Sequence, residues 1–223
     1  MNKKIAILTI GQSPRTDLQE TIQDFISPPV TCIEMGALDA LSLDEIHQLA
    51  PVNEHDPRLV TRLQSGDQVI VSAKLIQERM VHLVETCDKK EVDIIIIACT
   101  GHFPKFNTKI PIIYPDQVTL HWMHSIFSNQ HLCIVVPHNE QKEMIKQKWI
   151  DSFNNLSIIA CSPYEWNDNN AREIATFAEQ QQCDVIVMDC IGYAEQMKRM
   201  IQAETNLPVI LPRTLALSAS QHI

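Results

Sequence analysis

The sequence predicts an α/β protein with two lobes related by a pseudo-twofold axis, each built on a mainly parallel sheet flanked by helices. Three observations support this fold class. Short apolar runs alternate with longer amphipathic segments, one block of sequence recurs, and glycines follow several predicted strands. The chain has 223 residues, of which 45% are hydrophobic, so it can bury a substantial core.

Nine short runs rich in Ile, Val and Leu are predicted strands. Such runs, separated by helix-sized segments, are typical of parallel sheets with helical crossovers. They are residues 5–10, 30–35, 68–71, 93–98, 110–114, 132–136, 156–160, 184–188 and 208–211. Apolar residues near helical spacing predict helices at 17–26, 76–86, 141–153, 171–182 and 195–205.

An internal repeat predicts the two lobes. The block DIIIIACTG at 93–101 matches DVIVMDCIG at 184–192, and PIIYP at 111–115 matches PVILP at 208–212, in the same order. Chance resemblance between buried strands is the alternative to duplication, but a duplicated half explains both matches. We therefore expect a first lobe at 1–115 and a second at 116–212, with a C-terminal helix at 213–223 packing on the first.

Composition narrows the class of partner. The net charge is −9 and no basic run occurs, which argues against nucleic-acid binding. No stretch approaches the roughly 20 apolar residues of a membrane span, and seven cysteines without a CxxC pair indicate reduced thiols. We expect a cytoplasmic protein that binds a small carboxylate or amino-acid-like ligand and no membrane, with a homodimer as one assembly to consider.

The repeat places a cysteine after a strand in each lobe. Ligands of parallel α/β sheets bind beyond the carboxyl ends of the strands, where free backbone N–H groups are available. Thiols there can transfer protons near neutral pH. If the lobes are pseudo-symmetric, Cys99 and Cys190 approach one site from opposite sides, with their sulfurs about 6–8 Å apart. The other five cysteines are predicted to be packing residues.

Residues beside these cysteines and after the other strands are the candidate ligand contacts. Gly11-Gln12-Ser13-Pro14-Arg15 follows the first strand, and we read Ser13 as a helix N-cap, Pro14 as the first helical residue and Arg15 as a carboxylate ligand. Capping alone also explains Ser13 and Pro14, and a solvated Arg15 is the alternative. Further candidates are Thr100, Gly101, His102, His138, Ile191, Gly192, Arg213 and Thr214.

Two histidine pairings raise a competing possibility. Cys99-x-x-His102 and His121-x-x-His124 could supply four zinc ligands, although a predicted strand separates the pairs and His121 and His124 fall in a possible helix. We expect no metal, and His102 is instead predicted to neighbour the Cys99 thiol.

The opening ILTIGQSPR at 7–15 and the VMDCIG block at 187–192, together with the length, resemble the AroM family. That family is grouped with the aspartate/glutamate and hydantoin racemases, maleate isomerases and arylmalonate decarboxylases. The resemblance spans the chain and implies a racemase-like fold, no cofactor, and Cys99 and Cys190 as acid and base. In those racemases the second cysteine is followed by Thr and His, whereas here Ile191 and Gly192 follow it.

The resulting hypothesis is a cofactor-independent racemase or isomerase acting at a carbon next to a carboxylate or carbonyl. Two alternatives remain open. One is a single-thiol isomerase or decarboxylase, and the other is a non-catalytic metabolite-binding protein on the same scaffold. They predict different roles for the thiols, since only a two-base racemase needs both.

Overall fold

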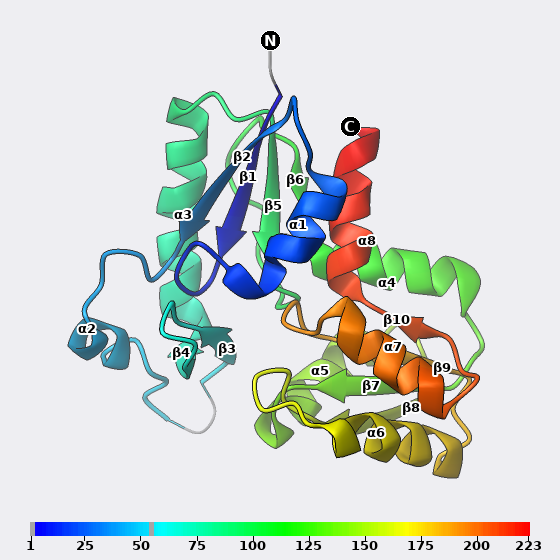
Figure 1. The fold of residues 1–223 in the computed structure, drawn as a ribbon. Helices are drawn as coiled ribbons and strands as arrows, with labels where there is room; N and C mark the ends of the chain where they lie inside the picture. Colours follow the sequence, from blue (N-terminus) through cyan, green and yellow to red (C-terminus); the bar gives the residue numbers. More distant parts are fainter. Residues whose placement is uncertain (1–2, 54–55) are drawn as a thin grey trace. The chain divides into compact units, whose positions relative to one another are not determined.

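The computed structural model describes residues 3–53 and 56–223 and shows a mixed α/β protein with mainly parallel sheets flanked by helices (Figure 1). The predicted fold class is confirmed in these terms. The chain divides into two units, Met1–Pro115 with Ala216–Ile223, and Asp116–Leu215.

The first unit is built on a four-stranded parallel sheet. Its strands are β1 (Lys4–Thr9), β2 (Thr31–Gly36), β5 (Ile94–Ala98) and β6 (Ile112–Ile113), in the order β2-β1-β5-β6. Its helices are α1 (Gln19–Phe25), α2 (Leu43–His47) and α3 (Ala73–Lys89), with a 3-10 turn, η1 (Thr16–Leu18), before α1. The strands that the sequence predicts at 5–10, 30–35, 93–98 and 110–114 are therefore present.

One predicted strand of this unit has a different setting. The segment 68–71 is β4 (Gln68–Ser72), which pairs antiparallel with β3 (Arg58–Arg62) in a separate hairpin rather than joining the parallel sheet. Gly66 sits in the turn with a φ of +96°, which favours glycine. A glycine turn between two β-branched runs is a hairpin signal that could have located β3.

The second unit repeats the sheet of the first. Its strands are β7 (Leu132–Val136), β8 (Leu156–Ala160), β9 (Val185–Met188) and β10 (Val209–Ile210), all parallel, in the order β10-β9-β7-β8. Its helices are α5 (Lys142–Ile150), α6 (Asp168–Gln180) and α7 (Glu195–Glu204), with a 3-10 turn, η2 (Asn139–Gln141), before α5. Taken in chain order, both sheets have the arrangement second, first, third, fourth, so β5 and β9 are topologically equivalent.

Two helices contain the boundaries between the units. α4 (Pro115–Ile126) begins at the first boundary, and α8 (Pro212–Ala219), followed by the 3-10 turn η3 (Ser220–His222), contains the second. The chain end contacts the first unit, since Gln221 Nε2 donates to the Phe25 carbonyl at 3.3 Å and Lys3 Nζ to the Ser220 carbonyl at 3.4 Å. The second unit thus runs to residue 215, three residues beyond the expected boundary.

The strands have near-continuous apolar sequences because helices cover both faces of each sheet. Every residue of β5 and of β7 is buried. In the second unit, Cys133 and Val135 pack in the cluster that contains Ile174 of α6, whereas Ile134 packs with Trp149 of α5. Successive residues of one strand thereby face opposite helical layers.

Helix length bears on the expectation that no membrane is involved. Within the described residues, no helix combines the length and the apolar character that crossing a membrane requires.

Candidate functional site

The two repeated cysteines follow the equivalent strands of the two sheets. Cys99 comes directly after β5, and Cys190 lies two residues after β9. Both are nearly buried, with exposed fractions of 7% and 9%. Each unit therefore presents a thiol at the carboxyl end of its third strand, where parallel sheets bind their ligands.

Each thiol accepts a hydrogen bond from the backbone amide two residues later. The amide of Gly101 donates to Cys99 Sγ at 3.2 Å, and that of Gly192 donates to Cys190 Sγ at 3.4 Å. An N–H group directed at sulfur stabilises the thiolate relative to the thiol. The same local device thus accompanies both cysteines.

The glycines permit this close turn. A Cβ atom at Gly101 would lie 2.8 Å from Leu59 Cδ2, and one at Gly192 would lie 2.8 Å from Tyr164 Oη. Both distances are too short for non-bonded heavy atoms, so a side chain at either position would require the Leu59 or Tyr164 side chain to shift. The glycines predicted to matter after the strands therefore allow Leu59 and Tyr164 to pack closely against the two turns.

The residues that follow Cys190 are mainly apolar. Ile191 is 7% exposed, and Tyr193 is fully buried with its hydroxyl donating to the Cys161 carbonyl at 2.6 Å. Burial raises the pKa of Tyr193 well above its ordinary value, and the nearby thiol of Cys190 acts in the same direction. The phenol is consequently protonated at neutral pH, and its proton is donated to the Cys161 carbonyl.

Asp189, directly before Cys190, is directed away from that thiol. Its carboxylate accepts hydrogen bonds from Lys148 Nζ at 2.8 Å and from Trp149 Nε1 at 2.8 Å, both on α5. The alternation of side chains along an extended segment explains this direction. Asp189 therefore does not replace the Thr-His pair that follows the second cysteine in the racemases.

The loop after β1 differs from the predicted helix start. Ser13 is not an N-cap, and Pro14 is not a first helical residue, because η1 begins only at Thr16. Ser13 instead donates from its amide and its hydroxyl to the two oxygens of Asp39, at 2.7 and 2.6 Å. Asp39 also accepts from the Gly36 amide at 2.7 Å, so it joins the loops after β1 and β2. Asp39 is not among the residues predicted from the sequence, because no motif surrounds it.

Gly11 and Gln12 contact the β3–β4 hairpin. A Cβ atom at Gly11 would lie 2.4 Å from the Arg62 carbonyl oxygen and 2.4 Å from Thr61 Oγ1, so only glycine fits. The Gln12 side-chain oxygen accepts from the Gln64 amide at 2.9 Å. These two candidate ligand residues therefore have contacts within the first unit that do not involve a ligand.

Arg15 lies in a network of its own. It is 3% exposed, and its guanidinium donates to both oxygens of Asp17, at 2.8 and 2.7 Å, and to Thr9 Oγ1 at 3.1 Å. Burial acts to raise the pKa of Asp17, but the hydrogen bond and the charge of Arg15 outweigh it and lower that pKa. The positive charge expected to bind a ligand carboxylate is thus matched by a carboxylate of the protein.

The remaining candidates lie at the start of loops or helices. Thr100 is 6% exposed, while His102 is exposed and its carbonyl accepts from Gln77. His138 immediately precedes η2. Arg213 and Thr214 lie in the first turn of α8; Arg213 is 2% exposed, and Thr214 Oγ1 has no hydrogen-bond partner among the described residues.

The five other cysteines have their own environments. Burial raises the pKa of Cys32, Cys87 and Cys161 to about 11, with help from neighbouring acidic groups. Cys133 donates a hydrogen bond to Cys183, which lowers the pKa of Cys183 and raises that of Cys133. Cys183 lies just before the amino end of β9, whereas Cys190 follows the carboxyl end of that strand.

The histidines considered as zinc ligands have other contacts. His121 Nδ1 lies 2.9 Å from the Gln117 carbonyl oxygen within α4, and the His124 ring packs edge-on against Phe153. Among residues 3–53 and 56–223, no three His, Cys, Asp or Glu side chains are grouped so that they could hold a metal ion.

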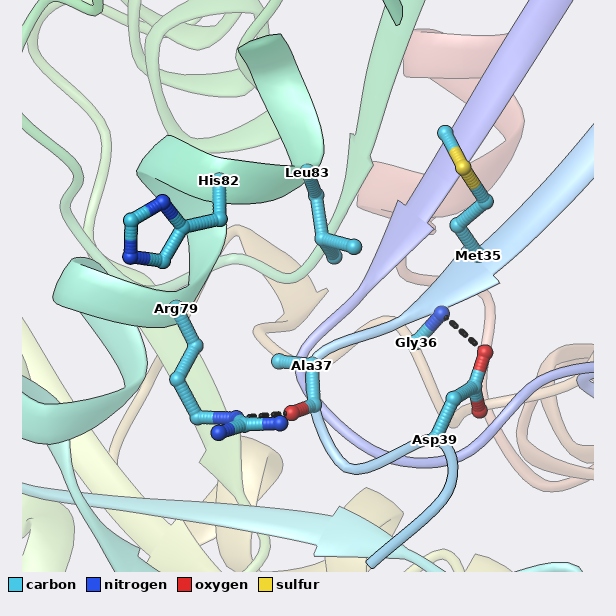
Figure 2. A pocket seen from close by; sticks show the side chains of 7 residues that line it. All are labelled: Met35, Gly36, Ala37, Asp39, Arg79, His82 and Leu83. Carbon is cyan, nitrogen blue, oxygen red and sulfur yellow. Dashed lines mark hydrogen bonds between the residues drawn. The ribbon is translucent and has the colours of Figure 1, made fainter. Parts of the chain in front are cut away.

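A separate cavity of 340 Å³ lies in the first unit between the end of β2 and α3 (Figure 2). Its wall includes Met35, Asp39 and Leu83, and the Arg79 guanidinium crosses it to donate to the Ala37 carbonyl (Figure 2). None of the candidate residues from sequence analysis lines this cavity.

Solved structures with the same fold include racemases and a decarboxylase. Allantoin racemase from Klebsiella pneumoniae has a TM-score of 0.59 at 13% identity, covering 99% of this chain and 87% of the other. Glutamate racemase from Thermus thermophilus gives 0.64 at 12%, covering 99% and 80%, and unliganded arylmalonate decarboxylase gives 0.63 at 9%, covering 99% and 92%. At these identities the comparison shows a common fold.

Sequence comparison gives the family. No curated protein sequence matches the chain. The model of the AroM protein family matches residues 5–222, which is nearly the whole sequence. The resemblance inferred from the opening loop and the second cysteine block is confirmed, and the chain belongs to the AroM family.

Proposed function

We propose that the protein is a cofactor-independent racemase or isomerase acting on a small carboxylate or amino-acid-like substrate. Cys99 and Cys190 serve as the acid and the base at the carbon next to a carboxylate or carbonyl. The observation that carries the proposal is the matched pair of amide-to-sulfur hydrogen bonds, at 3.2 Å in one unit and 3.4 Å in the other.

The chemistry needs one thiolate and one thiol. The thiolate removes the α-proton, leaving a carbanion whose charge is delocalised into the adjacent carbonyl group. The opposite thiol then returns a proton to the other face, so the two sulfurs exchange protonation states in each turnover. An amide N–H directed at each sulfur suits this reaction, because either thiol must be able to hold the negative charge.

The other candidate residues enter the proposal as substrate contacts. Thr100, adjacent to Cys99, can donate its hydroxyl to a substrate oxygen, and the Thr214 hydroxyl lacks a partner among the described residues. Arg213, directly before Thr214 in the first turn of α8, is a second candidate to bind a carboxylate beside Arg15.

The proposal is tested by α-proton exchange. The full-length protein is incubated in deuterated water with L- and D-amino acids, hydantoins and related 2-substituted acids, and deuterium at the α-carbon is scored by mass spectrometry. Enzyme-dependent exchange with conversion between enantiomers supports a racemase. Absence of exchange across the panel would contradict the proposal and favour a binding protein.

A single-thiol isomerase or decarboxylase is the second candidate. It is favoured by the asymmetry of the residues after the two cysteines, Thr100 and His102 in the first unit but Ile191 and Tyr193 in the second. Tyr193 cannot assist Cys190, since its hydroxyl is bound to the Cys161 carbonyl. This alternative predicts that one thiol can be replaced without loss of turnover.

A further inference from the structure

A buried ion pair adjoins Cys190 in the second unit. Lys148 Nζ lies 2.8 Å from both carboxylate oxygens of Asp189, and Trp149 Nε1 donates to one of them at 2.8 Å. The side chains of Lys148 and Asp189 are 14% and 1% exposed. The Lys148 ammonium also lies 5.5 Å from the centroid of the Trp149 ring. These contacts make a connected group, Asp189, Lys148 and Trp149, here called the α5 anchor.

The α5 anchor compensates a buried negative charge. Lys148 donates to both carboxylate oxygens of Asp189, and Trp149 donates to one of them. A carboxylate this deeply buried is strongly destabilising unless a cation neutralises it. Lys148 supplies that cation, so removing its charge would leave an unpaired carboxylate in the residue next to the thiol.

The α5 anchor also fixes the chain around Cys190. The Asp189 amide donates to the Val135 carbonyl on β7 at 2.8 Å, and the Cys190 amide donates to the Met188 carbonyl at 2.8 Å. The side chain of Asp189 is tied to α5, while its backbone is tied to β7. Adjacent Cα atoms are about 3.8 Å apart, so this fixation acts directly on Cys190.

In the first unit the carboxylate of this anchor is replaced by an alanine. Ala98 occupies the position before Cys99, where Asp189 stands before Cys190, although the surrounding blocks match. The negative charge and its neutralising lysine are therefore particular to the second thiol. A role in general folding of the repeated unit would be expected at both positions.

We propose that Lys148 is a positioning residue for Cys190. Lys148 acts through Asp189: it neutralises the carboxylate next to the thiol and holds the turn after β9 in place. The proposed role rests on the proposed function, in which Cys190 is one of the two proton-transfer groups, and it names the residue that holds this group in place. The charged and titratable groups in this region are grouped around Tyr193, three residues after Cys190. They are Cys161, Tyr164, Asp189 and Cys190 itself.

The test measures the thiol itself, without substrate. Native protein and the variants Lys148→Met, Asp189→Asn and Lys148→Met/Asp189→Asn are treated with iodoacetamide between pH 6 and 9.5. Modification of Cys190 is followed by tandem mass spectrometry, which separates it from Cys183 in the tryptic peptide 173–198. Lys146→Met is the matched control, because Lys146 is an exposed lysine on the same helix.

The single variants should move the reaction in opposite directions. Lys148→Met leaves a bare carboxylate and should slow alkylation at pH 7.5 by roughly three- to tenfold, whereas Asp189→Asn leaves a bare ammonium and should accelerate it similarly. The double variant should return within about twofold of native. Lys148→Arg keeps the positive charge and should therefore shift the rate less than Lys148→Met does. A purely structural anchor would instead move both single variants in the same direction.

Shifts in the same direction, or no shift, overturn the inference. If Lys148→Met fails to fold, Asp189→Asn decides alone, and a rate equal to or below native overturns it. Because no substrate is used, an inactive protein with opposite shifts would refute the proposed function while leaving this inference intact.

Discussion

The backbone amide of Gly192 donates to the sulfur of Cys190 at 3.4 Å, and a Cβ atom at that glycine would lie 2.8 Å from Tyr164 Oη. The same relation joins Gly101 to Cys99 at 3.2 Å. Since the two turns follow topologically equivalent strands, the duplicated block in the sequence corresponds to a duplicated amide-to-sulfur contact.

The first prediction concerns the reactivity of the cysteines. Cys32, Cys87 and Cys161 have pKa values raised to about 11, so at pH 8 only about one thiol in a thousand is ionised. A backbone amide donates a hydrogen bond to the sulfur of Cys99 and of Cys190, which stabilises the thiolate. These two cysteines should therefore be alkylated by iodoacetamide before the other three, as measured by peptide mass spectrometry. Equal rates at all five positions would refute the special environment of the repeated thiols.

The second prediction concerns the Arg15–Asp17 pair. Arg15→Ala should lower the free energy of unfolding by about 3–5 kcal/mol, because it removes the cation that is hydrogen-bonded to the nearly buried Asp17 carboxylate. Urea denaturation at pH 7 measures this change. Asp17→Ala/Arg15→Ala should recover part of the loss, since it removes the unpaired charge, and a double variant less stable than Arg15→Ala would contradict this account.

The third prediction is the pH dependence of the same pair. The pKa of Asp17 is lowered in the folded protein, so its contribution to stability is present above its ordinary value of 3.8 and is lost as the pH falls through the lower folded value. Between about pH 5 and 2, the native protein should therefore lose stability more steeply than Asp17→Asn. Parallel curves from urea denaturation would show that Arg15 does not stabilise this carboxylate.

The fourth prediction concerns Gly11. Gly11→Ala should destabilise the protein by about 1–3 kcal/mol, because the added Cβ meets the Arg62 carbonyl oxygen at 2.4 Å. Adding Thr61→Ala removes the second clash, with Thr61 Oγ1, but leaves the backbone contact. The double variant should consequently remain less stable than Thr61→Ala alone by thermal unfolding, and full recovery would assign the conflict to the hydroxyl.

Much of the fold could be predicted from sequence because the strands are short and continuously apolar. The segments at 132–136 and 156–160 coincide with β7 and β8. Hairpin residues 58–62 were missed, since charged Arg58 and Arg62 end the run and its pairing partner, predicted at 68–71, was assigned to the parallel sheet. The pairing of a strand depends on its neighbours in space, which periodicity does not report.

The candidate site could be predicted less completely. The positions of Cys99 and Cys190 follow from the repeat and from strand ends, which are local features. The partners of Ser13 and Arg15 do not follow from local features. Asp39, the partner of Ser13, lies in another loop. Asp17, the partner of Arg15, is only two residues away, but an acid at that position is equally typical of a helix start. Whether a charged side chain binds a ligand or a group of the protein depends on tertiary packing, which the local sequence does not report.

The most direct test of the central claim replaces each thiol in turn, once a substrate has been identified by exchange. In deuterated water, Cys99→Ala and Cys190→Ala should both abolish racemisation, because each turnover needs one group to take a proton and another to give one. Each variant can still exchange the α-proton of one enantiomer, and the two should favour opposite enantiomers. If Cys99→Ala retains full turnover while Cys190→Ala is inactive, the two-base account is contradicted, and a single-thiol mechanism takes its place.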